Sequence, residues 1–95
     1  MPATDRAAFE AALRADGFRE IVEGGMPPNQ SREAHSHDFE VRGLVLDGEL
    51  QLGCDGIVTA YRPGDVFTMA AGREHTEAAG PGGYKSVAGR KRATG

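Results

Sequence analysis

The sequence has one cysteine, no tryptophan and only three histidines among its 95 residues. The single cysteine, Cys54, cannot close an internal disulfide, so we expect a chain compatible with a reducing cytoplasm. No apolar run approaches the ~20 residues that a membrane-spanning helix needs, and no signal peptide is recognisable. A net charge of −3 gives no overall attraction for nucleic acid or an anionic membrane. We therefore expect a cytoplasmic domain without nucleic-acid or membrane partners.

Familiar catalytic motifs are also missing. The sequence has no Gly-x-Ser-x-Gly nucleophile motif, no phosphate-cradling glycine loop, and no Cys/His pair with a third partner. Nucleophilic hydrolysis and nucleotide-dependent chemistry are therefore not indicated.

Glycine, in contrast, is abundant, with 14 residues. Turn signals rich in glycine separate short apolar stretches at intervals of about ten residues, a spacing typical of a sandwich or small barrel. A chain of this length makes one domain with one modest core. The expected strands are 18–22, 32–39, 42–46, 49–53, 57–61, 66–69, 74–79 and 84–88, with turns at 47–48, 55–56, 62–65 and 80–83 and an irregular loop from Gly24 to Pro28.

One helix is expected before these strands, over residues 4–16. Phe9, Ala12 and Leu13 share one face at helical spacing. Thr4 or Asp5 is suited to cap its start, and glycine at position 17 is suited to end it.

The three histidines are the candidate site. His35 and His37 are two residues apart, so on a strand both rings point to the same side. His75 lies in a second predicted strand, and Glu77 shares its face. Imidazole suits Zn, Cu, Fe and Ni, and three protein ligands with one open position are the usual layout of a working metal site. A nearby carboxylate could complete the coordination or accept a proton. The open alternative is that Glu77 is solvated at the barrel mouth.

Two segments, HSHDFEVRGLVLDGEL and YRPGDVFTMAAGREH, resemble the two signature motifs of the cupin superfamily of small β-barrels. The His-x-His pair and Gly48 match the first motif, and Gly64, Gly72 and His75 match the second at the family spacing. The resemblance covers about two thirds of the chain, from near position 30 to near 90.

The departures concern mainly the carboxylate ligand. Val41 stands where the family motif has its Glu, and Glu40 is one residue early. A slip of one residue sends a strand side chain to the opposite face, so Glu40 becomes a ligand only if a bulge re-aims it. Asn29, Ala70 and Ala79 replace the motif's first Gly, its Pro and its final Asn.

The resemblance implies an all-β, single-domain cupin, a double-stranded β-helix or jelly-roll barrel. Together with the residue patterns, it divides the chain into an N-terminal helix at 1–17, the barrel at 18–90 and a flexible basic tail at 91–95. It implies a divalent transition metal (Fe, Ni, Zn or Mn) on His35, His37 and His75, and a homodimer formed through N-terminal strands. The expected pocket lining is Phe39, Val41, Met69, Tyr61 and Tyr84, with Arg42 and Arg73 as rim residues that could bind a carboxylate.

Three functions follow as hypotheses. The first is metal-dependent binding or conversion of a small organic molecule, with dioxygenase or isomerase chemistry and Glu77 as the catalytic carboxylate. The second is a non-catalytic module that senses a small molecule or stores a metal. The third is a structural dimer whose histidines bind no metal.

Overall fold

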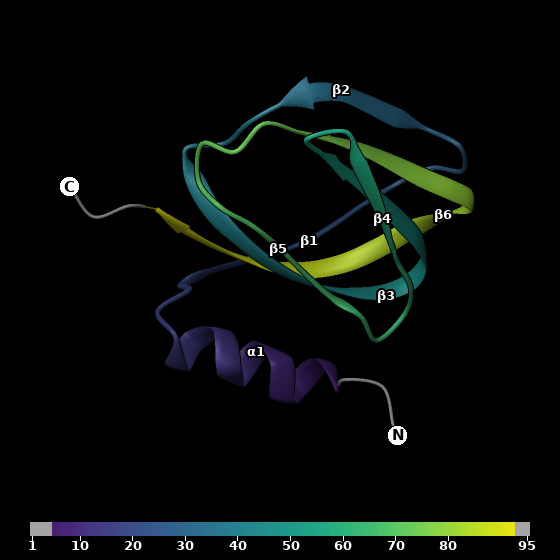
Figure 1. Ribbon diagram of the computed structural model, residues 1–95. Coiled ribbons are helices and arrows are strands. Elements are labelled where there is room, and N and C mark those ends of the chain that lie inside the picture. The colour runs from purple at the N-terminus through teal and green to yellow at the C-terminus, as the bar shows by residue number, and fades with distance from the viewer. Residues whose placement is uncertain (1–4, 93–95) are drawn as a thin grey trace.

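The computed structural model describes residues 5–92, which form a β-barrel with one helix packed on its outer face (Figure 1). The prediction of an all-β fold with a short N-terminal helix is confirmed. No helix in the described range is long and apolar enough to span a membrane. The elements in chain order are α1 (Arg6–Ala15), β1 (Glu20–Met26), β2 (Ser31–His35), β3 (Phe39–Cys54), β4 (Ile57–Tyr61), β5 (Val66–Met69) and β6 (His75–Arg92).

Helix α1 begins and ends with local signals that the sequence already carries. The Asp5 carboxylate accepts a hydrogen bond from the backbone N–H of Ala7 at 3.1 Å and caps the first turn. Gly17 follows the helix with φ of +89°, a conformation that glycine adopts without the steric cost of a Cβ. The predicted cap at Asp5 and the predicted stop at Gly17 are confirmed, whereas Thr4 lies outside the described residues.

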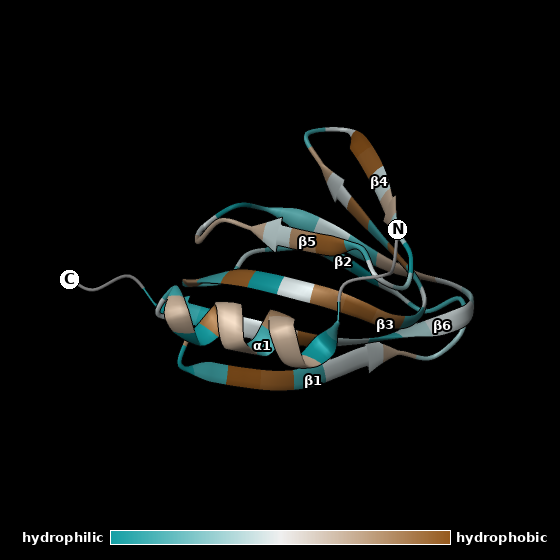
Figure 2. Ribbon diagram, turned by 90° about the horizontal axis from the view of Figure 1, so that it is seen from below, coloured by the Kyte–Doolittle hydropathy of each residue, from teal (hydrophilic) through white to brown (hydrophobic). Residues whose placement is uncertain are grey.

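The helix packs on the outer face of the sheet (Figure 2), where it contacts β3 and β6. Phe9 and Leu13 are buried there, but Ala12 is exposed, so the predicted apolar face is narrower than expected. Gly89 of β6 permits the close approach, because a Cβ on it would lie 2.9 Å from Phe18 Cβ and 3.0 Å from Leu13. The buried residues of this outer core are Phe9, Leu13, Phe18, Leu44 and Val87.

A second core fills part of the barrel interior, and two long strands connect the two cores. β3 and β6 pair antiparallel along most of their length, and each also pairs with shorter strands: β4 and β5 with β3, and β1 and β2 with β6. The buried residues of the inner core are Val45, Leu50, Leu52, Phe67 and Met69.

Two predicted turns are wrong, since the structure bends continuous strands at those positions. Gly48 pairs with Tyr84 and Leu50 pairs with Ala79, so the four residues 80–83 lie opposite Glu49. Gly48 has φ of +76°, and a Cβ on it would overlap the carbonyl oxygen of Gly83. The glycine-rich segments therefore meet each other at a corner of the barrel, where the pairing of β3 and β6 is interrupted over Glu49 and residues 80–83 and continues on either side.

This corner changes which residues of β6 face the interior. Before it, His75 and Glu77 line the barrel cavity, whereas after it the even-numbered residues Tyr84, Ser86 and Arg90 do. The register slips by an odd number of residues at the corner, and a strand has a side-chain period of two. The shift therefore brings both halves of β6 to one cavity.

Three further element boundaries differ from the predictions. β1 continues through Gly24-Gly25 to Met26, because every one of its residues pairs with β6. β2 ends at His35, so His37 lies in the connection 36–38 and not on the strand. Lys91 and Arg92 are the last residues of β6 and pair with β3, so the predicted tail is wrong for these two residues, while 93–95 lie outside the described range.

The hairpin at Asp55-Gly56 and the turn 62–65 are formed as predicted. Asp55 and Gly56 both have positive φ, +53° and +80°, the signature of a tight hairpin turn. In the second turn Asp65 N donates to the Arg62 carbonyl at 2.9 Å, and the Asp65 carboxylate accepts from Arg62 N at 2.8 Å.

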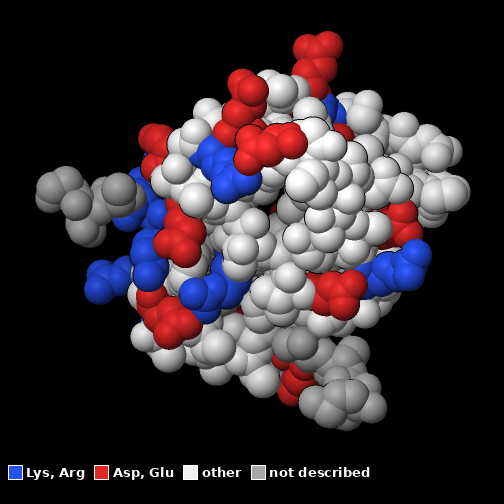
Figure 3. Space-filling view, viewed as in Figure 1, with Lys and Arg blue, Asp and Glu red and all other residues white. Residues whose placement is uncertain are grey.

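On the face shown in Figure 3, acidic and basic side chains are interspersed.

Candidate metal centre

His35, His37, His75 and Glu77 converge at one end of the barrel cavity. One ligand atom from each residue lies within 4.8 Å of every other. His35 ends β2 and His75 begins β6, and the two are direct partners in the register of these strands. The structure thus brings together residues about forty positions apart because β2 pairs with the start of β6.

Two of the rings are held in a fixed tautomer by the backbone. His35 Nδ1 lies 2.7 Å from the carbonyl oxygen of Glu33, and His75 Nδ1 lies 3.0 Å from that of Arg73. A carbonyl oxygen can only accept, so each Nδ1 carries the proton and each Nε2 is left with its lone pair when the ring is neutral. Metal-binding histidines in proteins are commonly oriented by this kind of bond.

The free nitrogens face a carboxylate. Nε2 of His35 lies 2.7 Å from Glu77 Oε2, and Nε2 of His75 lies 3.5 Å from the same oxygen. The first distance is short enough for an ion pair, but its angles do not make a hydrogen bond, and His35 Nε2 is buried without a hydrogen-bond partner. Lone pairs directed at a carboxylate repel it unless a proton or a metal cation lies between them.

His37 reaches the cluster from the connection 36–38 instead of from a strand. Its carbonyl accepts a hydrogen bond from Gly72 N at 2.7 Å, which fixes the connection against the turn before β6. Its ring stacks on Phe39, with centroids 4.8 Å apart and planes 13° apart. Burial lowers the pKa of His37, and the neighbouring His35 and His75 lower this pKa further, which favours the neutral ring that binds metals.

The geometry fits a metal ion. Donor atoms that share one ion at about 2.0–2.2 Å lie no more than about 4.4 Å apart, close to the spread of up to 4.8 Å seen here. Three imidazoles and one carboxylate suit Fe, Ni, Zn or Mn. The cluster is compatible with a metal ion, and the buried, unpartnered Nε2 of His35 is the atom that such an ion would satisfy.

Glu40 and Val41 occupy the places that strand alternation predicted. Val41 lines the cavity, whereas Glu40 lies outside the histidine cluster, beside Thr68, Ala70 and Lys91. The carboxylate of the cluster belongs instead to Glu77, which the sequence singled out by its spacing from His75.

A cavity of about 240 Å³ adjoins the cluster. Of the predicted lining residues, Phe39, Val41, Met69 and Tyr84 border it. Tyr61 does not border it and packs edge-on against Phe67, with centroids 6.0 Å apart. Burial raises the pKa of Tyr84, and the negative charge of Glu77 raises this pKa further. The Tyr84 phenol is therefore a neutral hydrogen-bonding group at neutral pH.

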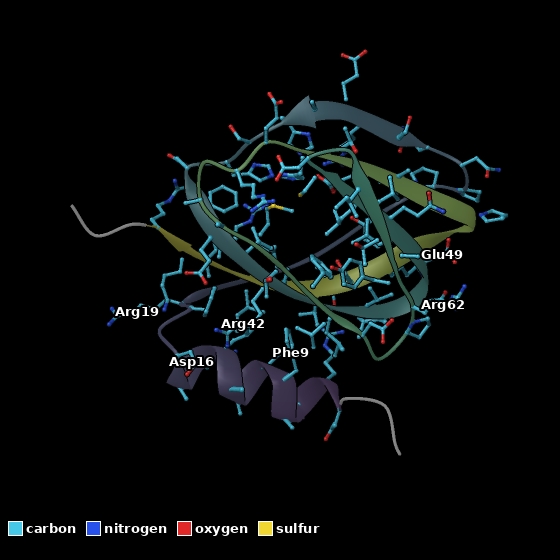
Figure 4. All side chains as sticks on the ribbon, in the orientation of Figure 1. Phe9, Asp16, Arg19, Arg42, Glu49 and Arg62 are labelled. Atoms are coloured by element: carbon cyan, nitrogen blue, oxygen red, sulfur yellow. The ribbon has the colours of Figure 1, made fainter. Side chains whose placement is uncertain are left out.

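The two predicted rim arginines are engaged elsewhere. Arg42 pairs with Asp16 after helix α1 at 2.5 Å, as Figure 4 shows, and Arg73 pairs with Asp55 at 2.7 Å. The arginines of the cavity wall are Arg32 and Arg90, which sequence reasoning missed. Spacing from His75 could not identify Arg90, because the corner at 80–83 reverses the alternation between them.

Comparison with known proteins supports the architecture. The family model of the cupin domain matches residues 22–80. None of the curated proteins matches the chain. The polyketide cyclase RemF from Streptomyces resistomycificus is 26% identical with a TM-score of 0.67, and the alignment covers 84% of this chain and 60% of that one.

Two further solved structures share the fold at lower identity. A Rhizobium leguminosarum bv. viciae 3841 protein is 21% identical with a TM-score of 0.72, covering 98% of this chain and 100% of its own. An RmlC-like cupin from Shewanella frigidimarina NCIMB 400 is 20% identical with a TM-score of 0.66, covering 77% of this chain and 65% of its own. The chain thus spans about two thirds or less of RemF and of the Shewanella protein. Since the family model matches more than half of the sequence, this chain belongs to the cupin domain family.

Proposed function

We propose that the protein holds a divalent transition metal on His35, His37, His75 and Glu77 and presents it to a small organic molecule in the adjoining cavity. The observation that carries this proposal is the convergence of four ligand atoms within 4.8 Å, including a buried Nε2 of His35 that has no partner. Of the candidate ions Fe, Ni, Zn and Mn, the ligand set favours none over the others.

The protein's own residues prepare the site for this role. Backbone carbonyls fix the tautomers of His35 and His75, so their Nε2 atoms need no reorientation on binding. Phe39 and Val41 provide an apolar wall beside the cluster and reduce its contact with water. When bound, such a metal would supply a Lewis acid beside the cavity.

Catalysis is the first candidate role. RemF, a similar structure at 26% identity, is a polyketide cyclase, and this supports a catalytic role for the cavity. The family resemblance adds oxygenase and isomerase chemistry. Glu77 is the carboxylate nearest to the site, and we propose it as a ligand; its role as a catalytic base stays a prediction.

The second candidate is a non-catalytic module that binds a small molecule or stores the metal. The cavity volume of about 240 Å³ supports a small ligand in either case. Homodimer formation and a cytoplasmic location likewise stay predictions.

Metal analysis of protein purified without a histidine tag tests the proposal. We expect close to one equivalent of a transition metal per chain, or stoichiometric uptake of added Zn²⁺, Ni²⁺, Mn²⁺ or anaerobic Fe²⁺ by calorimetry. Failure to take up any of these ions would refute the metal proposal. Product formation or oxygen consumption across a substrate panel then separates the enzyme from the binding module.

A further inference from the structure

Two arginines in the cavity wall differ from most arginines of the molecule. Six of the nine arginines form ion pairs with acidic side chains, namely Arg6, Arg14, Arg42, Arg62, Arg73 and Arg92. Of the other three, Arg19 is exposed and points away from the barrel (Figure 4). Arg32 and Arg90 both line the cavity, and neither forms an ion pair with any residue in the range 5–92.

Arg90 is unusual because it is half-buried. The other half-buried arginine, Arg42, has both an aromatic contact, with Phe18 at 4.7 Å, and a carboxylate partner, Asp16. Within residues 5–92, the Arg90 side chain has the aromatic contact, with Phe39 at 4.9 Å, and no carboxylate partner. A partly desolvated guanidinium has five N–H donors, and an aromatic face satisfies its charge but offers no acceptor for these donors.

The nearest acidic neighbour in the sheet does not fill this role. Glu20 lies opposite Arg90 in the β1–β6 register, yet it is exposed and the two form no ion pair. Arg32 lies opposite Glu77 in the β2–β6 register, but the Glu77 carboxylate is directed at the histidines. Both cavity arginines therefore retain donors for a ligand.

Arg90 and the histidine cluster belong to one wall. The Phe39 ring stacks on His37 and also lies under the Arg90 guanidinium, at 4.8 Å and 4.9 Å. Tyr84 and Ser86, on the same face of β6, add hydroxyl groups to this cavity. A molecule in the cavity can thus reach the cluster with one end and the guanidinium with the other.

We propose that the ligand of this cavity is a small organic carboxylate, with its carboxylate held by Arg90, assisted by Arg32, and its remaining polar group directed at the metal cluster. Arginine is suited to this role because its planar fork donates two parallel hydrogen bonds to a carboxylate. The inference rests on the proposed function for the metal end of the ligand, whereas the arginine end stands on the cavity alone.

The test uses a panel of small aliphatic and aromatic carboxylates, each paired with its neutral primary amide. Binding is measured by calorimetry and by ligand-observed NMR, on Zn²⁺-loaded and on EDTA-treated protein. We expect at least one carboxylate to bind the wild type about tenfold or more tightly than its amide. The variant Arg90→Gln should abolish that preference while retaining the wild-type Zn²⁺ stoichiometry.

Arg92→Gln is the matched control. Arg92 also lies over Phe39, at 5.4 Å, and is two residues away on β6, but it is exposed and paired with Asp38 at 2.9 Å. This variant should keep the carboxylate preference. If no carboxylate is preferred over its amide, or if Arg90→Gln retains the preference, the proposal is overturned.

The two proposals fail in different ways. An Arg90-dependent carboxylate preference in protein that takes up no metal would support the arginine subsite and overturn the metal proposal. Metal uptake without any Arg90-dependent carboxylate preference would support the metal proposal and overturn the arginine subsite.

Discussion

Glu77 Oε2 on β6 lies 2.7 Å from Nε2 of His35 on β2, although the two side chains share no hydrogen bond. The His35 ring is fixed by its Nδ1 bond to the Glu33 carbonyl, so the neutral ring presents the lone pair of Nε2 to a carboxylate. Such an arrangement is stable only with positive charge between the two groups. This relationship supports the metal proposal more directly than the motif does, because Nε2 of His35 is buried and has no hydrogen-bond partner.

His75→Ala should remove bound metal and leave the barrel folded. The His75 ring supplies one ligand atom of the cluster, while the inner core rests on apolar side chains such as Leu50 and Phe67. Metal content by mass spectrometry and circular dichroism would check both parts. A variant that unfolds would show instead that the site is structural.

Glu77→Gln should weaken metal binding by about tenfold or more, since it replaces an anionic ligand with a neutral amide. Glu40→Gln is the matched control, because Glu40 lies outside the cluster and should leave the affinity unchanged. Zn²⁺ titrations of the two variants measure the difference. Equal loss in both would place Glu40 at the site, against the strand alternation described above.

The Tyr84 phenol should titrate above its ordinary pKa of 10.0, because burial and the Glu77 charge raise this pKa. Its neutral form is therefore favoured in the folded state, and the unfolded chain loses this proton first as the pH rises. The free energy of unfolding should be unaffected by this group below about pH 10 and should fall as the pH rises further.

Ultraviolet titration of metal-free Tyr61→Phe protein isolates this signal, since the sequence has only two tyrosines. Chemical denaturation at several alkaline pH values, with Tyr84→Phe as the reference, measures the stability effect. An ordinary pKa in the folded protein would contradict the placement of Tyr84 in the cavity wall.

Leu13→Ala should lower the free energy of unfolding by about 2–5 kcal/mol, the usual cost of emptying a fully buried leucine site. Leu13 lies on helix α1, is 0% exposed, and packs against the outer face of the barrel. Urea denaturation would measure the loss, with the exposed Ala12→Ser as the control on the same helix. A negligible loss would mean that α1 contributes little to the stability of the barrel.

The fold class could be predicted from the sequence because its signals are local and repeated. Asp55-Gly56 and the turn 62–65 have turn chemistry that requires no distant partner. Asp5 and Gly17 define the helix in the same way. The four residues of the cluster were also identifiable, three as the only histidines and Glu77 by its spacing from His75.

The positions where strands end, and the side of the sheet to which each side chain points, depended on pairing between segments distant in sequence. The segments of Gly48 and Gly83 each have the composition of a turn, but in the structure their backbones approach closely at a corner where the register of β3 and β6 shifts. His37 approaches the cluster from a connection held by Gly72, a contact that no local pattern encodes.

The sequence by itself determined which chemistry is present: three imidazoles, one carboxylate at the right spacing, and enough turn residues for a small barrel. Only the tertiary structure decided which of these side chains point into the barrel cavity. The odd register shift at residues 80–83 turned Tyr84 and Arg90 into the cavity of His75 and Glu77. The physical reason is that side-chain facing in a sheet alternates with every residue, so one bulge reverses every assignment beyond it.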